Sequence, residues 1–313
     1  MKIKDITQFL ERIVPLDYQE SYDNCGLIVG DENTELSSVL ICIDSVEEVV
    51  DEAIEKGCNL IIAHHPIVFS GIKKLNGKNH IEKTLIKAIK NDISIYALHT
   101  NLDNILVGVS GKIADLLNLK NQRILAPKKG FLRKLEVYVP IENVKDVQNA
   151  LFDCGAGSIG NYKNCSFQSV GLGTFFPEEE SHPTIGKLGV QQKVEEVKIE
   201  VVFHKNIENT VIKKMKNAHP YEQVAYQIYI LDNFSPQVGC GVLGHLKKEV
   251  DAKDFLKTLK KIIKTDCIRH TKLVKKSIRK VAVCGGSGFF LLDNAKHAGA
   301  DVFITSDFKY HEF

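Results

Sequence analysis

The sequence predicts an α/β protein in which a smaller α+β domain is inserted into a discontinuous α/β domain. Over residues 1 to about 125, short apolar runs alternate with helix-like segments, the pattern of strands joined by crossover helices. The polar turn from Ala126 to Gly130 ends this alternation, and half-exposed strands follow it. After Pro236 a strand and helix pattern returns. We therefore expect residues 1–127 and 236–313 to form the first domain and residues 128–235 the insertion.

Three apolar runs define the expected sheet of the first domain. They extend from Val39 to Asp44, from Asn59 to His65 and from Ile93 to His99. Short, continuously apolar runs are typical of strands covered on both faces of a parallel sheet. The segments between them, residues 46–55 and 81–91, are helix-like. Because such crossovers are right-handed, the three strands should lie parallel, with their carboxyl ends at one edge.

The insertion has a different pattern of apolar and polar residues. Alternating apolar and polar residues predict strands at 133–140, 194–203 and 224–230. Helical periodicity is present at 144–154 and 207–217. This is the outline of a small α+β module.

Two short motifs each admit two interpretations. The glycine-rich turn from Cys284 to Gly288 leads from a strand into a helix, whose free amides could hold an anion or phosphate, or it serves packing alone. Its spacing matches neither the dinucleotide nor the phosphate-loop fingerprint. The segment from His219 to Glu222 either contributes to a site or only ends a helix and turns into the next strand.

Composition excludes several classes of protein. The 313 residues include 44% hydrophobic and 26% charged residues, as in an ordinary globular protein. A net charge of +2, from 41 basic and 39 acidic residues, predicts neither a nucleic-acid nor a membrane partner. The eight cysteines include no close pair, which favours the reducing cytoplasm. We expect no export signal and no membrane span.

The candidate functional residues stand at the ends of apolar runs, where open α/β sheets bind their ligands. A fourth run, from Asp301 to Asp307, also ends in a possible ligand. We expect one shared rim formed by Asp44, His64, His65, His99, Asp103 and Asp307. The alternative is that the adjacent histidines only finish a strand and face solvent.

Imidazole and carboxylate ligands together suit zinc, iron or manganese, whereas no cysteine cluster suggests a thiolate zinc site. Adjacent residues of an extended strand point to opposite sides, so two ions flanking His64 and His65 are more natural than one shared ion. Asp103 would complete one coordination sphere and leave positions open for water. Two such ions can activate water and hold both the attacking and the leaving oxygen of a hydrolysis.

Several motifs together resemble the Nif-three-like family, whose members are dinuclear-metal, hexamer-forming proteins often labelled GTP cyclohydrolase one, type two homologues. In the first domain these motifs are Glu20-Ser21-Tyr22-Asp23-Asn24-Cys25-Gly26-Leu27, Ile61 to Pro66, His99-Thr100-Asn101-Leu102-Asp103 and Gly299 to His311. In the insertion, Gly155 to Tyr162, Gly171 to Phe175 and His219 to Glu222 resemble the longer bacterial members, which carry a central ferredoxin-like module similar to the signalling protein PII.

The resemblance implies that His64, His65 and Asp103 bind two divalent metal ions and that the chain forms a homohexamer. It also implies a histidine and a glutamate in a segment of the form Gly-His-Tyr-x-x-x-Glu, beyond Lys309-Tyr310-His311. The sequence stops at Phe313, and His311 and Glu312 match the preceding motif instead. We therefore expect the natural protein to be longer.

The function expected from these observations is that of a metal-dependent hydrolase, in which activated water attacks a nucleotide-like or phosphorylated small molecule. His99 and His311 are candidates for proton transfer, or they make structural hydrogen bonds. The alternative is a non-catalytic metal-binding regulatory or adaptor protein, in which the inserted domain senses a small molecule. Nothing in the sequence identifies guanine recognition, and a fold does not determine chemistry.

Overall fold

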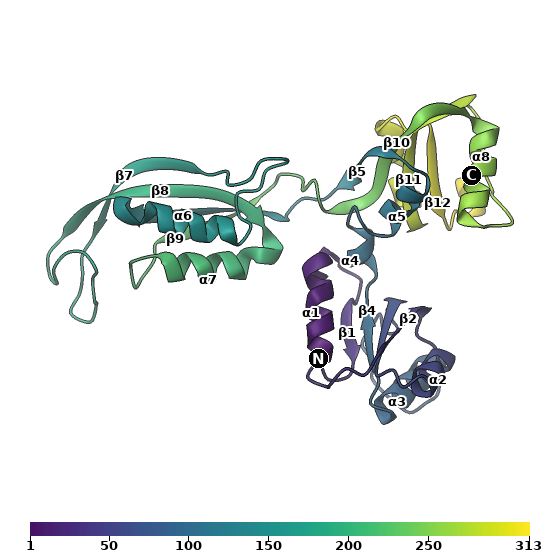
Figure 1. Ribbon diagram of the computed structural model, residues 1–313, viewed down its shortest axis with the longest axis horizontal. Helices are drawn as coiled ribbons and strands as arrows, with labels where there is room; N and C mark the ends of the chain where they lie inside the picture. Colours follow the sequence, from purple (N-terminus) through teal and green to yellow (C-terminus); the bar gives the residue numbers. More distant parts are fainter. The chain divides into compact units, whose positions relative to one another are not determined.

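The structure, a computed structural model, describes residues 1–313. Its contacts divide the chain into two compact units, Met1–Pro127 with Pro236–Phe313, and Lys128–Ser235. We call the first the discontinuous domain and the second the inserted domain, which is teal to green in Figure 1. The predicted α/β class with an inserted α+β module is confirmed. Every helix of the structure is too short or too polar to span a lipid bilayer.

The first sheet of the discontinuous domain has the strand order β1-β4-β3-β2. Its strands are β1 (Gly26–Val29), β2 (Val39–Asp44), β3 (Leu60–His65) and β4 (Ser94–Ala97), and the accompanying helices are α1 (Ile3–Ile13), α2 (Glu47–Glu55) and α3 (His80–Lys90). As predicted, β2, β3 and β4 are parallel. Strand β1 pairs antiparallel with β4. The carboxyl ends of the three parallel strands therefore lie along one edge.

Apolar packing holds this sheet against its helices. Ile61 of β3 and Ile95 of β4 are fully buried and form one cluster with Val50 and Ala53 of α2 and Ala88 of α3. All four residues of β4 are buried. Burying each of the isoleucine and valine side chains stabilises the fold by about 1.5–3 kcal/mol. The ends of β3 and β4 are thus held by a packed core.

A second sheet, of order β12-β11-β10-β5, completes this domain. It comprises β5 (Lys120–Pro127), β10 (Gly239–Asp251), β11 (Ser277–Ser287) and β12 (Val302–Ser306), with helices α4 (Thr100–Asp103), α5 (Val109–Leu116), α8 (Ala252–Ile263) and α9 (Leu292–His297). Strands β11 and β12 are parallel, whereas β10 is antiparallel to both its neighbours. Asp307 follows β12 of this second sheet, so it is not on the edge that β2, β3 and β4 share.

The glycine-rich motif at the end of β11 serves packing. The strand continues through Ser287, and the next elements are the 3-10 helix η4 (Phe289–Leu291) and the six-residue α9. A Cβ atom on Gly288 would lie 2.5 Å from Oγ1 of Thr305 and 2.6 Å from Cβ of Cys284. The Gly285 N–H already donates to Oγ of Ser110 at 3.0 Å. The packing interpretation therefore accounts for this turn.

The inserted domain is a single antiparallel sheet of order β7-β8-β6-β9. Its elements, in chain order, are β6 (Leu132–Pro140), α6 (Val144–Asp153), β7 (Phe167–Phe175), β8 (Gln192–His204), α7 (Glu208–Ala218) and β9 (Tyr226–Leu231). This β-α-β-β-α-β order is the split βαβ arrangement of ferredoxin-like folds.

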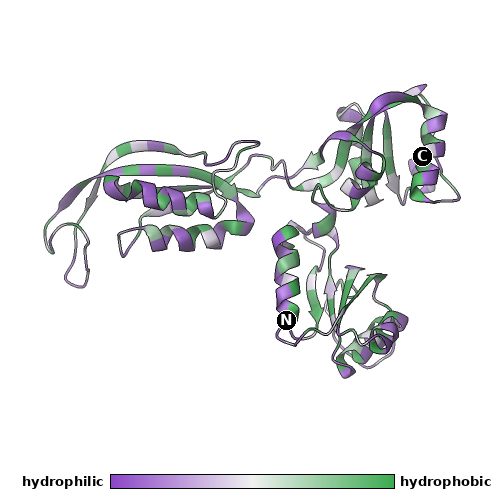
Figure 2. Cartoon of the chain, in the orientation of Figure 1, coloured by the Kyte–Doolittle hydropathy of each residue, from purple (hydrophilic) through white to green (hydrophobic).

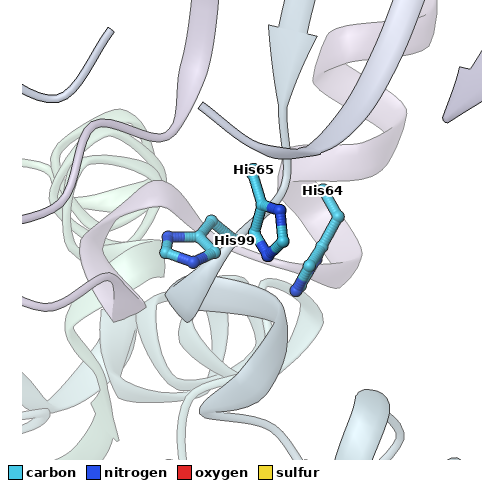
Figure 3. Close-up of side chains that lie close together, drawn as sticks. All are labelled: His64, His65 and His99. Atoms are coloured by element: carbon cyan, nitrogen blue, oxygen red, sulfur yellow. The ribbon is translucent and has the colours of Figure 1, made fainter. Parts of the chain in front are cut away.

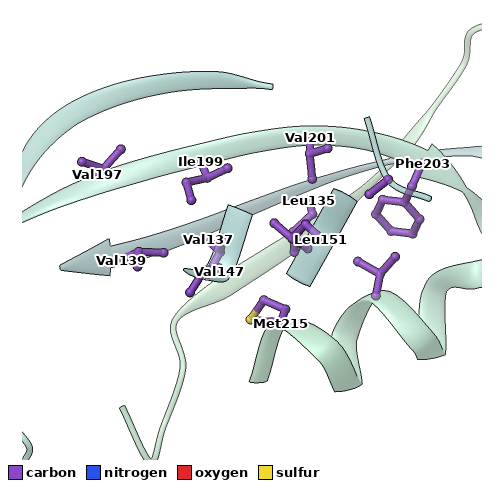
Figure 4. Close-up of a cluster of buried hydrophobic side chains, with 12 residues drawn as sticks. Leu135, Val137, Val139, Val147, Leu151, Val197, Ile199, Val201, Phe203 and Met215 are labelled. Atoms are coloured by element: carbon purple, nitrogen blue, oxygen red, sulfur yellow. The ribbon is translucent and has the colours of Figure 1, made fainter. Parts of the chain in front are cut away.

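The helices of the inserted domain cover one face of its sheet. Figure 4 shows the buried side chains of β6 and β8 directed toward those of α6 and α7, among them Val137, Ile199, Leu151 and Met215. Green and purple segments alternate along these strands in Figure 2, as expected when alternate residues face the core. The second face of the sheet has no helix layer.

Sequence patterning missed β7. Of its nine residues, seven are exposed and none is buried, and two are glycines. An edge strand without a buried row shows no period-two apolar signal. Its antiparallel register with β8, from Phe167 opposite Glu200 to Phe175 opposite Gln192, is nevertheless continuous.

Candidate metal centre

Three histidines meet where β3 and β4 end. His64 and His65 are the last residues of β3, and His99 lies just beyond β4 as the N-cap of α4. The ring centroids are 5.0 Å apart for His64 and His65, 5.3 Å for His64 and His99, and 5.5 Å for His65 and His99. One ring nitrogen of each lies within 4.8 Å of those of the other two. Figure 3 shows the three rings side by side.

Strand register explains this meeting. Ala63 of β3 pairs in parallel with Ala97 of β4, so both strands finish at the same level. The Leu98 N–H then donates to the Ala63 carbonyl oxygen at 2.9 Å, which extends the pairing by one residue. The residues that follow, His64 and His65 on one strand and His99 on the other, leave the sheet together.

Each imidazole is held through its Nδ1 atom by a different hydrogen-bond acceptor. His64 Nδ1 lies 2.8 Å from the Leu98 carbonyl oxygen. His65 Nδ1 lies 2.8 Å from Oδ1 of Asp44, and His99 Nδ1 lies 2.8 Å from Oδ1 of Asp23. Because a carbonyl oxygen or carboxylate can only accept, each neutral ring carries its hydrogen on Nδ1. The Nε2 lone pair of every ring is therefore available to a metal ion.

Asp23 is the most strongly held acceptor in this group, with a side chain that is fully buried. It accepts from the backbone N–H of Thr100 at 3.0 Å, from that of Asn24 at 2.8 Å and from the Thr100 hydroxyl. Burial opposes ionisation, but the hydrogen bonds from Thr100, His99 and Asn24 outweigh it and lower the pKa of Asp23 to about 2. An ionised carboxylate therefore faces the imidazole of His99.

A second carboxylate, Asp103, follows His99 by one turn of α4. Residues four apart share a helix face, which explains the place of Asp103 beside the histidines. Burial raises the pKa of Asp103 to about 6, although His99 and His65 favour its charged form, and Asp23 adds to the rise. A metal ion bound beside Asp103 would favour the ionised carboxylate and so lower this pKa, which is the effect expected at a metal ligand.

His64 is suited to coordination by its environment. Burial lowers its pKa more than the hydrogen bond to the Leu98 carbonyl oxygen raises it. The ring is therefore kept neutral, the form in which imidazole binds metals. The three clustered imidazoles, with the Asp103 carboxylate near them but outside the group whose ring nitrogens lie within 4.8 Å of one another, are donors of the types that zinc, iron and manganese take.

The other predicted residues lie outside this group. Asp44 contacts it as the partner of His65 Nδ1, with a side chain that is 64% exposed. His311 lies in the 3-10 helix η5 (Tyr310–Glu312) after β12, and its side chain is exposed. It is not one of the three clustered histidines.

Sequence patterning did not identify Asp23 as a functional residue. It is not at the end of an apolar run, and its partner His99 lies 76 residues away in the chain. The signal that could have found it is its place in the motif from Glu20 to Leu27, which leads into β1.

Comparison with known proteins gives a consistent result. The family model described as Duf34/NIF3 (NGG1p interacting factor 3) matches residues 1–313. The curated protein "GTP cyclohydrolase 1 type 2 homolog" of Bacillus subtilis is 40% identical over 309 residues, which cover 98% of this chain and 83% of that protein. The protein of the same name from Staphylococcus aureus is 36% identical over 312 residues, covering 100% of this chain and 85% of its own length.

Solved structures agree with these relatives. A Bacillus cereus protein described as related to NIF3 has a TM-score of 0.87 and 40% identity, over 100% of this chain and 84% of that one. The Staphylococcus aureus protein SA1388 has a TM-score of 0.75 and 33% identity, over 100% and 83%. The resemblance expected from the sequence motifs is confirmed.

Proposed function

The chain belongs to the Duf34/NIF3 family, and from this membership and its histidine cluster we propose that it is a metal-dependent hydrolase. The observation that carries the proposal is the shared geometry of His64, His65 and His99. Each has its Nδ1 hydrogen bonded to an acceptor, and a ring nitrogen of each lies within 4.8 Å of the others.

We assign His64, His65 and Asp103 to the ligand set, as the sequence predicted, and we add His99. The Asp23 carboxylate bound to His99 Nδ1 supports this addition, because metal-binding histidines commonly donate their second N–H to a carboxylate. The same relation joins Asp44 to His65. We leave His311 out of the proposed site because it has no contact with the cluster to support a role in proton transfer.

The proposed cofactors are two divalent ions of zinc, iron or manganese. When bound, such ions would activate a water molecule and polarise the oxygen of the bond to be broken. The chain's own residues would hold this site in place: Asp23 and Asp44 orient two rings, and the Leu98 carbonyl oxygen orients the third. Residues held in this way lose little freedom on binding, which favours a preorganised site.

The proposed substrate is a nucleotide-like or phosphorylated small molecule. The names of the curated relatives, GTP cyclohydrolase 1 type 2 homolog, support this class. Family resemblance also supports a homohexamer, and the scattered cysteines support a place in the reducing cytoplasm. Light scattering should give a mass of six chains, and a monomer mass would contradict this part of the proposal.

Metal content per chain tests the site. The wild-type protein, purified without an affinity metal and loaded separately with Zn²⁺, Mn²⁺ or Fe²⁺, should retain about two ions by mass spectrometry. His65→Ala should lower this content, whereas His270→Ala, which changes an exposed histidine outside the cluster, should not. Equal metal content in both variants would contradict the proposed centre.

Turnover separates the hydrolase from the alternative, a metal-binding regulatory or adaptor protein. The loaded wild type should hydrolyse at least one member of a panel of nucleotides and sugar phosphates, and His65→Ala should lose turnover in parallel with metal. A protein that keeps its metal but hydrolyses no member would favour the regulatory role.

A further inference from the structure

The inserted domain contains a cavity of about 840 Å³. It lies against the face of the sheet opposite α6 and α7. Val137, Val139 and Val197 belong to the core beneath the helices, so the alternate residues Tyr138, Glu196 and Lys198 point to the other face. These three line the cavity, together with Tyr221 and β7. Its volume is that of a site for a small organic molecule.

One buried carboxylate, Glu196, lies in this cavity without a protein cation. The residue is only 9% exposed. The neighbouring ammonium groups bind other acids: Lys198 Nζ lies 3.0 Å from Oε1 of Glu200, and Lys134 Nζ lies 2.6 Å from Oε1 of Glu136. No ion pair within residues 1–313 includes Glu196. A buried charge is costly unless a partner of opposite charge compensates it.

The Tyr221 hydroxyl adds a second polar atom at the same place. It is buried and contacts the Glu196 carboxylate, to which it is positioned to donate a loose hydrogen bond. Burial and the nearby Glu196 carboxylate raise the pKa of Tyr221, so the phenol stays protonated. The phenol can donate to this carboxylate but carries no positive charge, so the charge of Glu196 remains uncompensated.

The backbone is adapted to the Glu196 carboxylate. A Cβ atom on Gly173 of β7 would lie 2.2 Å from Oε2 of Glu196, so any larger residue would displace the acid. Gly171, two residues earlier on the same strand, has no atom within 4 Å of the same position. A side chain at 173 would therefore have to move the acid from its present position, whereas one at 171 would not.

The wall of the cavity is fixed to the domain at several points. The segment between β7 and β8, residues 176–191, is hydrogen-bonded to the motif from His219 to Glu222. The His182 N–H donates to Oε1 of Glu222 at 2.9 Å, and the Thr184 hydroxyl donates to the Pro220 carbonyl oxygen at 2.8 Å.

His219 itself places Tyr221. Its Nε2 lies 2.9 Å from the Tyr138 carbonyl oxygen, and its Nδ1 accepts from the Tyr221 N–H at 3.1 Å. The motif from His219 to Glu222 thus has a function in shaping this cavity.

We propose that the cavity binds a small organic cation, an amine or amidine with an apolar body. Its charged nitrogen would donate to the Glu196 carboxylate and to the oxygen of Tyr221. The apolar part would lie against Leu172, Phe175, Phe176 and Ile185, which line the same cavity. The site belongs to the inserted domain alone and does not depend on the proposed hydrolase activity.

Isothermal titration of the full chain with 2-phenylethylammonium and benzamidine tests the proposal, with neutral 2-phenylethanol as the uncharged comparison. We expect saturable binding of at least one cation and at least tenfold weaker binding of 2-phenylethanol, because a charge-assisted hydrogen bond is lost. Absence of binding by both cations up to about 10 mM, or equal binding of the alcohol, would overturn the proposal.

Matched variants locate the binding. Glu196→Gln keeps the shape of the side chain and should weaken cation binding at least tenfold. Glu195→Gln, an exposed neighbour on the opposite side of the strand, should bind as wild type does. If Glu196→Gln does not fold, Gly173→Ala against Gly171→Ala makes the same comparison through the backbone. Wild-type affinity in both members of the folded pair would refute the site. Metal content is unaffected by any of these outcomes, so the proposed metal centre is tested separately.

Discussion

At the scale of single residues, the three imidazoles differ in what orients them. The acceptor for His64 is a backbone carbonyl group, which no substitution of Leu98 removes. The acceptors for His65 and His99 are the side chains of Asp44 and Asp23, which can be changed. Asp44 is 64% exposed whereas Asp23 is fully buried, so water weakens only the first of these contacts.

This difference predicts unequal effects on metal affinity. Asp23→Asn should weaken Zn²⁺ binding by about 10- to 100-fold, because the group that fixes His99 loses its charge and gains a donor facing the Thr100 N–H. Asp44→Asn should have a smaller effect. Competition with a chelating dye measures both affinities. A larger loss in Asp44→Asn would contradict the assignment of Asp23 as the stronger positioning group.

At the scale of elements, the carboxylate of Asp301, just before β12, binds both β11 and the loop that precedes β11. Asp301 accepts from the N–H groups of Arg279 and Lys280 at 2.9 and 2.7 Å and pairs with Lys275. Burial would raise its pKa, but these donors outweigh it, and the pKa of Asp301 is lowered. The charged form therefore contributes to the attachment of β12 to β11.

The lowered pKa predicts a pH-dependent stability. The contribution of Asp301 is fully present above its unfolded pKa of about 4 and is lost as pH falls through the lower folded value. Asp301→Asn should lower the free energy of unfolding by about 1–3 kcal/mol at pH 7.

Urea unfolding of both proteins between pH 3 and pH 7 measures this difference. It should shrink toward the acid end of the range, provided that the protein still folds there. Asp293→Asn, which changes an exposed acid of α9, serves as the control. A difference for Asp301→Asn that is independent of pH would contradict the argument.

The strength of the apolar pattern in the sequence explains which strands could be predicted. β2, β3 and β4 were predicted because continuous apolar runs, such as Leu60 to Ala63, have no other favourable place than a covered sheet. The glycines at 171 and 173 removed that signal from β7. The run ending in Asp307 is a strand as predicted, but a run does not specify which of two sheets it joins.

The candidate site was predictable only in part, because local sequence patterns do not report contacts between residues far apart in the chain. His64 and His65 are adjacent in the chain, and His99 shares their position at a strand end. The contacts of Asp23 with His99 and of Glu196 with Gly173 depend on the three-dimensional fold, because each partner belongs to a different element. Local patterns carry no information on such pairs.

At the scale of the whole molecule, the metal-site residues and the inserted domain are separate along the chain. His64, His65, His99 and Asp103 all precede residue 128. In the discontinuous domain, Pro127 of β5 pairs directly with Gly239 of β10, so the two ends of the insertion are close together.

This proximity predicts that the inserted domain can be removed. Replacing residues 128–235 with a short glycine and serine linker should leave the metal content per chain unchanged, because no ligand is lost and β5 can still reach β10. Metal analysis and circular dichroism of the shortened protein measure the result. A folded product without metal would show that the insertion contributes to the centre.

The pairing of β5 with β10 also bears on the order in which the chain folds. In sequence the two strands are separated by an entire domain, and closing so long a flexible loop costs conformational entropy and slows the search for the correct partner. If the inserted domain folds first, its own compact structure holds the two ends near each other and acts as a short tether. During synthesis the insertion would then be folded before β10 is available to pair with β5. The slow step in maturation would be the return of β10 to β5.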